Sequence, residues 1–332
     1  MNSGDPAPQA HILRMGDPKD PLEAVDPAAP RIVRAGFQLP VSDTGRRTAF
    51  AEWLVSKDNP LTARVMVNRI WQLRMGVGLV KTPNDFGIMG GHPSNQALLD
   101  ALAAEFRDMG WNMKALDRQI LLSDTYRQST TGNPAAEKAD PENRLLWRMN
   151  RKRLDAEALR DAVLVAAGTL NQKVGGSPVR IPIEPEVYDL IFTEYERDGL
   201  WPVSPDKNVQ NRRGIYLLNK RGVRLPLMSA FDQPDAITSC PVRPVSTHAL
   251  QALSLFNSDF MQEQSMALAK NLEKQCKSDA RACQIQTAWT RTLSRAATPK
   301  ELAMARKFLA AGGTLQEMSL ALLNRNEFVY VP

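Results

Sequence analysis

The stretch that decides the fold class is residues 93–128, PSNQALLDALAAEFRDMGWNMKALDRQILLSDTYRQ. Ser94 is a residue type that caps helices, and the apolar residues after it recur every three or four positions on one helical face. These residues are Leu98, Leu99, Leu102, Phe106 and Met109. Gly110 stands where helices commonly end, and Asn112 can cap the next helix. The stretch therefore predicts a helical hairpin.

Helical patterns continue on both sides of this hairpin. On its amino-terminal side we predict a helix from Arg46 to about residue 57 and a central helix over residues 60–73. On its carboxy-terminal side we predict helices over residues 154–171, from Ser246 or Thr247 to Phe256, from Ser258 onward, and around Trp289 and Leu293. Two capping boxes, Thr298 to Glu301 and Thr314 to Glu317, predict two more helix starts. The predicted fold class is mainly α, a multi-helix globular domain with a few short strands and long Pro-rich loops.

Proline and glycine divide the chain into four segments. Residues 1–45 form an extended lead-in arm, with short strands or extended pieces from His11 to Met15 and from Arg31 to Val33. Residues 46–171 are a helical amino-terminal half, and residues 246–332 are a helical carboxy-terminal half. Between them, residues 172–245 form a long loop excursion, with a short helix near Glu186 to Glu194 and a short strand from Arg213 to Leu218. We expect residues 46–332 to form one domain.

Composition points to an ordinary folded protein, with 43% hydrophobic and 23% charged residues. No window approaches 18 consecutive apolar residues, so we expect no membrane span. Residues 1–11 lack the basic start and apolar core of a signal peptide. The chain is therefore either cytoplasmic or a piece of a longer exported protein. No oligomeric state follows from the sequence.

The formal net charge of +6 raises the question of a nucleic-acid partner. The basic residues are spread along the chain, apart from one dense run made of Arg144, Arg148, Arg151, Lys152 and Arg153. We interpret this run as a solvated helix end, with anion binding as the alternative. Because no nucleic-acid motif accompanies the run, we do not expect nucleic acid as a partner.

Cysteine and histidine spacing gives no metal or haem signature. The three cysteines form no CxxC or CxxCH motif. Cys276 and Cys283 lie on a predicted helix, which would hold their α-carbons about 10 Å apart, beyond disulfide reach. The three histidines are far apart in sequence. We therefore expect no metal site, no cofactor in this chain and no disulfide.

The predicted helix over residues 60–73 carries polar residues in an unusual position. Its apolar side chains surround the helix axis, as expected for a central helix buried on most sides. Four polar residues are nevertheless embedded within one arc: Arg64, Asn68, Arg69 and Gln72. Buried guanidinium groups need acidic or carbonyl partners. The candidate acidic partners are Asp85, Glu157, Asp161, Asp232 and Asp235.

Three interpretations of these residues stay open. The first is an internal ion-pair network that fixes the packing of the helices. The second is a polar cleft for an anionic or hydroxyl-rich ligand, completed by Arg243, Ser246, Thr247 and Gln251. The third is a hydrolase site, in which Asp232 and Asp235, or Asp85, act as the acid and base of glycoside hydrolysis. A structure separates them, since a catalytic site needs convergent carboxylates in an open cleft.

Seven motifs in order resemble the family of the domain of unknown function 1553 (DUF1553), which is known from planctomycetes and related bacteria. They are FAEWLVSKDNPLTARVMVNRIW at residues 50–71, GLVKTPNDFG at 78–87, SDTYRQS at 123–129, NRLLW at 143–147, FDQPD at 231–235, QAL at 251–253 and NEFVY at 326–330. The resemblance covers most of the chain.

The resemblance implies a setting but no catalytic residues. In such proteins the domain stands at the carboxy-terminal end of large exported proteins, often joined to a cytochrome-c-like module. It therefore implies an exported or periplasmic location, and an upstream domain or separate cytochrome-c-like protein as partner. This sequence lacks a signal peptide, a haem motif and the upstream modules. From these observations we expect an accessory or binding module beside a redox or polysaccharide-processing partner, with a polysaccharide hydrolase or a purely structural domain as alternatives.

Overall fold

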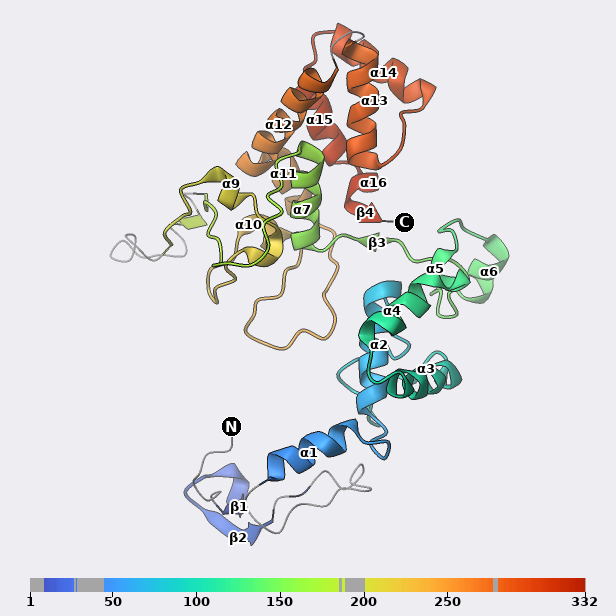
Figure 1. Ribbon diagram of the computed structural model, residues 1–332, viewed down its shortest axis with the longest axis vertical. Coiled ribbons are helices and arrows are strands. Elements are labelled where there is room, and N and C mark those ends of the chain that lie inside the picture. The colour runs from blue at the N-terminus through green and yellow to red at the C-terminus, as the bar shows by residue number, and fades with distance from the viewer. Residues whose placement is uncertain are drawn as a thin grey trace. The chain divides into compact units, whose positions relative to one another are not determined.

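The computed structural model describes residues 9–26, 28, 45–184, 187–188, 201–276 and 280–331. Contacts within the chain define two compact units, unit 1 (Met1–Asn150) and unit 2 (Arg151–Pro332). This boundary falls inside the segment 46–171 that the sequence analysis treats as one helical half. The described residues are mainly helical, which confirms the predicted fold class (Figure 1). None of the described helices combines the length and apolar character that crossing a membrane requires.

Unit 1 is built around helix α2 (Thr62–Met75), which packs against α3 (Gln96–Asp108) and α4 (Met113–Leu122). Its core includes the buried side chains of Val67, Leu99, Phe106 and Leu116. The other elements are an antiparallel hairpin of β1 (Ala10–Leu13) and β2 (Pro21–Val25), the 3-10 helix η1 (Arg14–Gly16), and helices α1 (Arg46–Val55), α5 (Asp124–Arg127) and α6 (Pro134–Ala139).

The predicted helical hairpin of residues 93–128 is confirmed as α3 and α4. Asn112 caps α4 as expected, since its side-chain oxygen accepts from the amide N–H of Ala115 at 3.1 Å. The cap of α3 is Asn95 and not Ser94, because the Asn95 side chain reaches the amide N–H of Leu98 at 3.0 Å. Ser94 instead donates its own amide N–H to the carbonyl of Leu79.

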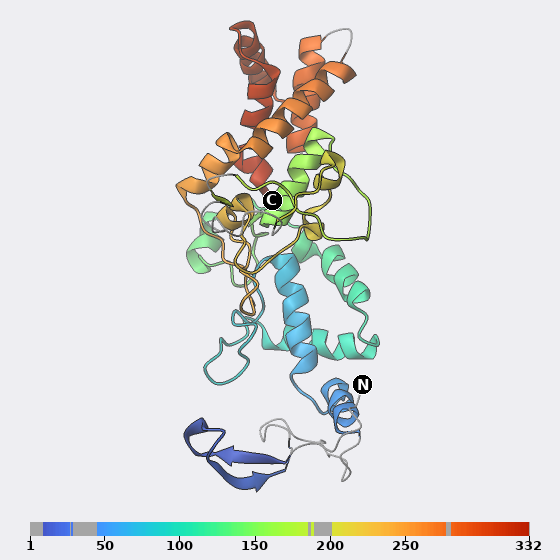
Figure 2. The same cartoon turned by 90° about the vertical axis from the view of Figure 1, so that its left-hand side faces the viewer.

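Unit 2 is built around helix α12 (Asp259–Gln275), which packs against α7 (Ala156–Ala167), α13 (Ala280–Leu293) and α15 (Leu315–Leu323) (Figures 1 and 2). The strands β3 (Lys152–Arg153) and β4 (Tyr330–Val331) form a short antiparallel pair. The remaining elements are α9 (Lys207–Gln210), η4 (Gly214–Tyr216), α10 (Pro226–Ala230), α11 (Ala249–Asn257), α14 (Pro299–Ala310) and α16 (Asn326–Val329).

Capping signals in the sequence predicted two helix starts of unit 2 correctly and a third one wrongly. Both capping boxes are present, at Thr298 with Glu301 and at Thr314 with Glu317. Helix α11, in contrast, begins at Ala249 instead of Ser246 or Thr247. The reason is that Ser246 uses both its amide N–H and its hydroxyl to bind a carboxylate, as described below.

The excursion between the helical halves departs from its prediction. The expected strand from Arg213 to Leu218 is wrong, because Gly214–Tyr216 form a 3-10 turn closed by the Tyr216 amide on the Arg213 carbonyl. Only an isolated bridge joins Leu217 to Val179. The predicted helix over residues 154–171 is shorter, since Gly168 ends α7 with φ at 76°. The predicted strand at 31–33 lies outside the described residues, as does the predicted helix at 186–194 apart from residues 187–188.

The basic run of residues 144–153 is not a solvated helix end. Residues 140–151 form turns and loop, and Arg153 lies in strand β3 with a buried side chain. The last two residues of the run form a strand and not a helix end, because Lys152 pairs with Val331 of β4 and Arg153 pairs with Tyr330.

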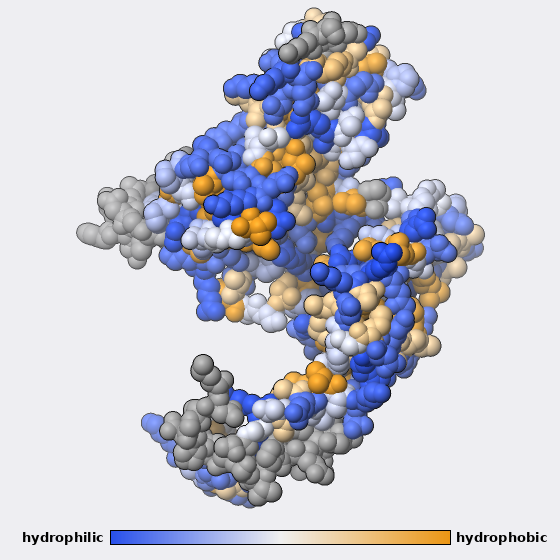
Figure 3. All heavy atoms as spheres, in the orientation of Figure 1, coloured by the Kyte–Doolittle hydropathy of each residue, from blue (hydrophilic) through white to orange (hydrophobic). Residues whose placement is uncertain are grey.

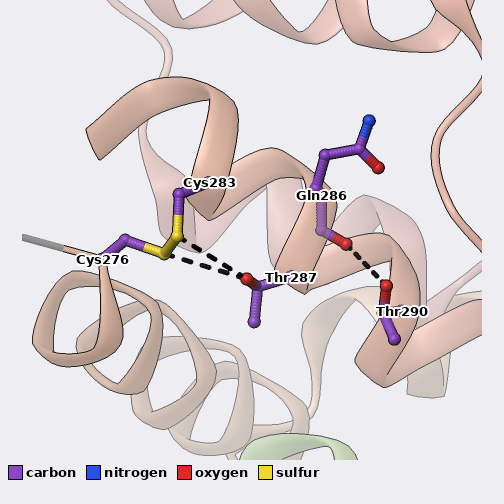
Figure 4. Close-up of a disulfide and its surroundings, with 5 residues drawn as sticks. All are labelled: Cys276, Cys283, Gln286, Thr287 and Thr290. Carbon is purple, nitrogen blue, oxygen red and sulfur yellow. Dashed lines mark hydrogen bonds between the residues drawn. A yellow bond between two sulfur atoms is a disulfide. The ribbon is translucent and has the colours of Figure 1, made fainter. Parts of the chain in front are cut away.

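Cys276 and Cys283 form a disulfide, which the sequence analysis did not expect (Figure 4). Helix α12 ends before Cys276, so the two cysteines do not share one continuous helix. Their α-carbons are therefore 5.7 Å apart, within disulfide reach. The Thr287 hydroxyl lies 3.8 and 3.9 Å from the two sulfur atoms. The third cysteine, Cys240, is free and exposed.

Candidate functional site

The four polar residues of α2 have different surroundings within unit 1. Asn68 is fully buried and clamps Val80, donating to its carbonyl at 3.0 Å and accepting from its amide N–H at 2.8 Å. Arg69 is exposed and donates to the Asn84 side chain at 3.0 Å. Gln72 is half-buried. The four residues therefore do not form one buried charged arc.

Arg64 is only partly buried, and its acidic partner is one that the sequence analysis did not name. Its Nε donates to the Asp100 carboxylate at 2.6 Å, and its Nη1 donates to the Pro60 carbonyl. Ten residues further along α2, close to three turns, Arg74 makes a bidentate pair with Asp117, with both N–O distances at 2.8 Å. These two ion pairs join α2 to α3 and α4. They are packing contacts between helices, and no local sequence signal distinguishes Asp100 and Asp117, 36 and 43 residues away, from the other acidic residues.

Asp232 lies in a closed polar network of unit 2. Its Oδ2 accepts from Arg153 Nη2 at 2.7 Å and from the Ser246 amide at 2.9 Å, and its Oδ1 accepts from the Ser246 hydroxyl at 2.7 Å. Burial alone would raise the pKa of Asp232, but the hydrogen bonds from Ser246 and Arg153 outweigh burial and hold the pKa below its ordinary value.

Arg153 completes this network by binding backbone carbonyls. It donates to the carbonyl of Ser246 at 2.7 Å and to that of Phe231 at 3.3 Å. Gln251 adds donations to the carbonyls of Ala230 and Ser246 at 3.0 and 3.1 Å. Asp232, Ser246 and Gln251 thus lie in one network around Arg153, a residue that was predicted to belong to a solvated basic run.

Glu157 and Arg243 form a second pair of predicted residues. Arg243 Nη1 lies 2.6 Å from Glu157 Oε2, and Gln233 donates to Glu157 Oε1 at 3.2 Å. Burial would raise the pKa of Glu157, yet Arg243 and the other donors keep it lowered. Thr247, which was predicted to line the same cleft as Arg243, is exposed.

The Asp161 side chain binds the backbone of the excursion. Its Oδ1 accepts from the Gly214 amide at 2.6 Å, and burial raises its pKa. The neighbouring Arg160 is 2% exposed and donates to the carbonyls of Arg212 at 2.8 Å and Gln210 at 2.6 Å. Burial lowers the pKa of Arg160 to about 10. Residues of α7 thus hold the irregular chain around residues 210–214.

The other two carboxylates considered for catalysis act as turn formers. Asp235 is exposed, and its Oδ1 accepts from the amides of Ile237 and Thr238 at 2.9 and 3.4 Å. Asp85 is also exposed, and its Oδ1 accepts from the Gly87 amide at 2.9 Å. Such side-chain bonds to following amides are typical of Asp in turns. Within the described part of the chain, no group of three or more His, Cys, Asp or Glu side chains could hold a metal ion.

Unit 1 contains a pocket of about 90 Å³, here called the unit 1 pocket, which was not predicted from the sequence. Its apolar lining comes from Trp71, Val77, Leu79 and Leu146. Its polar lining comes from Lys81, His92, Ser94, Glu142, Asn143, Arg144 and Asn150. The only sequence signal was indirect, since segments 78–87 and 143–147 belong to the motifs of the family resemblance.

The model of a family described as a protein of unknown function (DUF1553) matches residues 46–309. The chain belongs to the DUF1553 family. The DUF1553 match includes the residues of the unit 1 pocket and those of the Arg153–Asp232 network. No curated protein and no solved structure matches the chain.

Proposed function

We propose that this DUF1553 chain is an accessory binding module, acting beside a redox or polysaccharide-processing partner, and that the partner performs the chemistry. The observation that carries the proposal is the hydrogen bonding and the burial of the Asp232 carboxylate. Its two carboxylate oxygens accept three hydrogen bonds from Arg153 and Ser246, and its side chain is only 14% exposed.

A carboxylate with these partners is poorly suited to acid or base catalysis. A general base must reach a proton on the substrate, and a general acid must hold a proton near the operating pH. The lowered pKa of Asp232 opposes the protonated form, and its oxygens already have donors. Asp235 and Asp85 are accessible, but each is committed to closing its own turn. The arrangement therefore supports a structural role for these three residues over the hydrolase alternative.

The partner and the compartment are also part of the proposal. The expectation of a cytochrome-c-like or polysaccharide-processing partner derives from the modules to which DUF1553 domains are often joined. The Cys276–Cys283 disulfide supports an oxidising, extracytoplasmic location, since disulfides persist in such compartments and are rare in the cytosol. Thiol titration of the protein isolated from its native compartment tests this point. One reactive thiol, that of Cys240, is expected, whereas three would contradict it.

Activity and binding measurements on one set of samples test the function. The wild-type chain and Asp235→Asn are incubated with acidic and neutral polysaccharides, and both reducing-end release and retardation in affinity electrophoresis are recorded. We expect retardation by an acidic polysaccharide without reducing-end release. Release that is lost in Asp235→Asn, while the melting temperature is unchanged, would replace the proposal with the hydrolase. Asp235 is the informative position because its exposed side chain can be changed without opening a buried network.

A further inference from the structure

We propose that the Cys276–Cys283 disulfide is a thiol–disulfide exchange centre, in which a partner dithiol attacks Cys283 and reduction releases the end of α12 from α13. On the face of the molecule in view, hydrophobic residues form small separate groups among hydrophilic ones, so that face presents no broad apolar docking surface (Figure 3). The disulfide instead offers a reactive group with a defined geometry (Figure 4). The inference goes beyond the accessory function proposed above and does not rest on it.

The two cysteines of the disulfide differ in their exposure to solvent. Cys276 is 5% exposed, whereas Cys283 is an exposed residue. An attacking thiolate must approach one of the two sulfur atoms, and exposed disulfides are typically the labile, regulatory or catalytic ones. The difference in exposure therefore assigns Cys283 as the residue that is attacked and Cys276 as the leaving group.

The position of Cys283 in α13 favours its thiolate form. Cys283 lies in the first turn of this helix, which has 14 residues. The partial positive charge at a helix N-terminus stabilises an anion in the first turn and lowers the pKa of a cysteine placed there. In the reduced protein, Cys283 is therefore the sulfur that attacks an incoming disulfide, and Cys276 is the sulfur that closes the internal bond again.

The Thr287 hydroxyl lies beside the sulfur atom that leaves (Figure 4). Its oxygen is 3.8 Å from Cys276 Sγ and 3.9 Å from Cys283 Sγ. A hydroxyl can donate a hydrogen bond, and a hydrogen bond to the charged form of a group stabilises that form. Thr287 can therefore stabilise the thiolate that forms when the disulfide breaks.

The exchange consists of two displacements. A thiolate of the partner dithiol attacks Cys283 Sγ, a mixed disulfide forms, and Cys276 leaves as a thiolate. The second thiol of the partner loses its proton and attacks the partner sulfur of the mixed disulfide, and Cys283 leaves as a thiolate. The partner is oxidised to a disulfide, while the cysteine pair gains two electrons and, after taking up two protons, becomes two thiols.

Reduction has a structural consequence at the end of α12. The Cys276 amide donates to the Leu272 carbonyl at 3.1 Å, so Cys276 directly follows the last turn of the helix. The disulfide ties this end to the first turn of α13, and α12 is the helix around which unit 2 is built. The redox state of the pair therefore sets how firmly the two helices are held together at this end.

The rate of reduction by dithiothreitol at increasing urea concentrations below the unfolding transition tests whether the folded protein exchanges. The oxidised full chain with Cys240→Ser is used, and the reaction is quenched with N-ethylmaleimide and followed by mass spectrometry. We expect the rate constant to change by less than about twofold, because Cys283 is accessible without unfolding. A rate that rises in parallel with the unfolding equilibrium constant, or no reduction of the folded protein, would overturn the inference.

Two variants locate the sulfur that exchanges. With Cys240→Ser also present, Cys276→Ser leaves Cys283 as the only thiol, and Cys283→Ser leaves Cys276. Both are assayed below their melting temperatures, so that unfolded chains do not contribute. We expect glutathione disulfide to form a mixed disulfide with Cys283 at least about tenfold faster than with the buried Cys276. Equal rates, or a faster reaction of Cys276, would overturn the assignment.

The role of Thr287 is tested with a rescue and a matched control. Thr287→Val should slow reduction by about tenfold, since a hydrogen bond to a charged group is lost, whereas Thr287→Ser keeps the hydroxyl and should react within about twofold of wild type. The control is Thr290→Val, because the Thr290 hydroxyl donates to the Gln286 carbonyl at 2.9 Å (Figure 4). It should leave the rate unchanged. Equal slowing by the two valine variants would overturn the role of Thr287.

Discussion

Asp232 Oδ2 lies 2.7 Å from Arg153 Nη2, and this ion pair joins residues 79 positions apart in the chain. The Arg153 side chain is 3% exposed and that of Asp232 is 14% exposed. Arg153 also stacks on the Phe231 ring at 5.4 Å. One buried guanidinium therefore holds strand β3, the end of α10 and the approach to α11 in unit 2.

Replacing Asp232 with asparagine should destabilise the protein strongly. Asparagine tolerates the left-handed backbone at this position, where φ is 60°, so the substitution removes the charge and leaves the shape. Arg153 then keeps a buried charge without its carboxylate, which costs about 3–5 kcal/mol. The free energy of unfolding from urea titration measures this loss. Asp235→Asn is the control and should stay within about 0.5 kcal/mol of wild type. Equal stability of the two variants would show that the pair is not structural.

Acid sensitivity should concentrate at Glu301. The Arg295 guanidinium binds both of its oxygens at 2.8 Å, and the Thr298 amide donates at 2.9 Å, so the pKa of Glu301 lies well below its ordinary value of 4.5. A lowered pKa means stability that is present above pH 4.5 and is lost as the pH falls further. The melting temperature of wild type should therefore fall more steeply below pH 4.5 than that of Glu301→Gln. Parallel curves would contradict the prediction.

Sequence patterns predicted best what depends on near neighbours. The capping boxes at Thr298 and Thr314, and the cap at Asn112, involve residues three positions apart, so spacing alone reveals them. The prediction failed where one local assumption was wrong. Treating Cys276 and Cys283 as parts of one helix excluded a disulfide that forms because α12 ends before Cys276.

Partners distant in sequence could not be derived from spacing. Arg64 meets Asp100 because α2 and α3 pack together, and no local signal distinguishes Asp100 from the other acids of the chain. Arg153 was assigned to a solvated run because a basic cluster usually is one, and only the pairing of β3 with β4 shows it to be buried. The unit 1 pocket could not be derived from spacing either, because three segments that are separate in the sequence line it.

Arg64→Ala should cost much less than loss of the Asp232 charge. The side chains of Arg64 and Asp100 are 31% and 41% exposed, and partly exposed ion pairs contribute up to about 1 kcal/mol. Urea unfolding of Arg64→Ala measures the cost, and Arg69→Ala, which removes an exposed arginine on the same helix, is the comparison. A loss of about 3 kcal/mol or more in the free energy of unfolding is typical of a broken buried ion pair, and it would restore the expectation of a buried network on α2.

Cys283→Ser should lower the stability of unit 2. The disulfide closes a short loop between residues seven positions apart, and the chain-entropy relation gives about 2–3 kcal/mol for a loop of this size. Thermal melting of oxidised wild type and of Cys283→Ser measures the difference, and a reducing agent should remove it by bringing wild type down to the variant. Cys240→Ser, which changes the free exposed cysteine, should melt like wild type. A reductant effect of equal size on Cys283→Ser would mean that another bond is responsible.

Gly78→Ala tests whether the wall of the unit 1 pocket is as rigid as its hydrogen bonds indicate. A β-carbon at this position would lie 2.6 Å from the Val80 carbonyl oxygen and 2.8 Å from Asn68 Oδ1, so it would break the clamp that joins these two residues. Forcing an added methyl group into such a site costs about 1–3 kcal/mol. Gly132→Ala is the matched control, because a β-carbon there meets nothing within 4 Å, and it should be neutral or slightly stabilising since alanine restricts the unfolded chain. If urea unfolding gives the two variants the same stability, the segment at Gly78 can shift freely, and a pocket with pre-ordered walls is the wrong description of this part of the molecule.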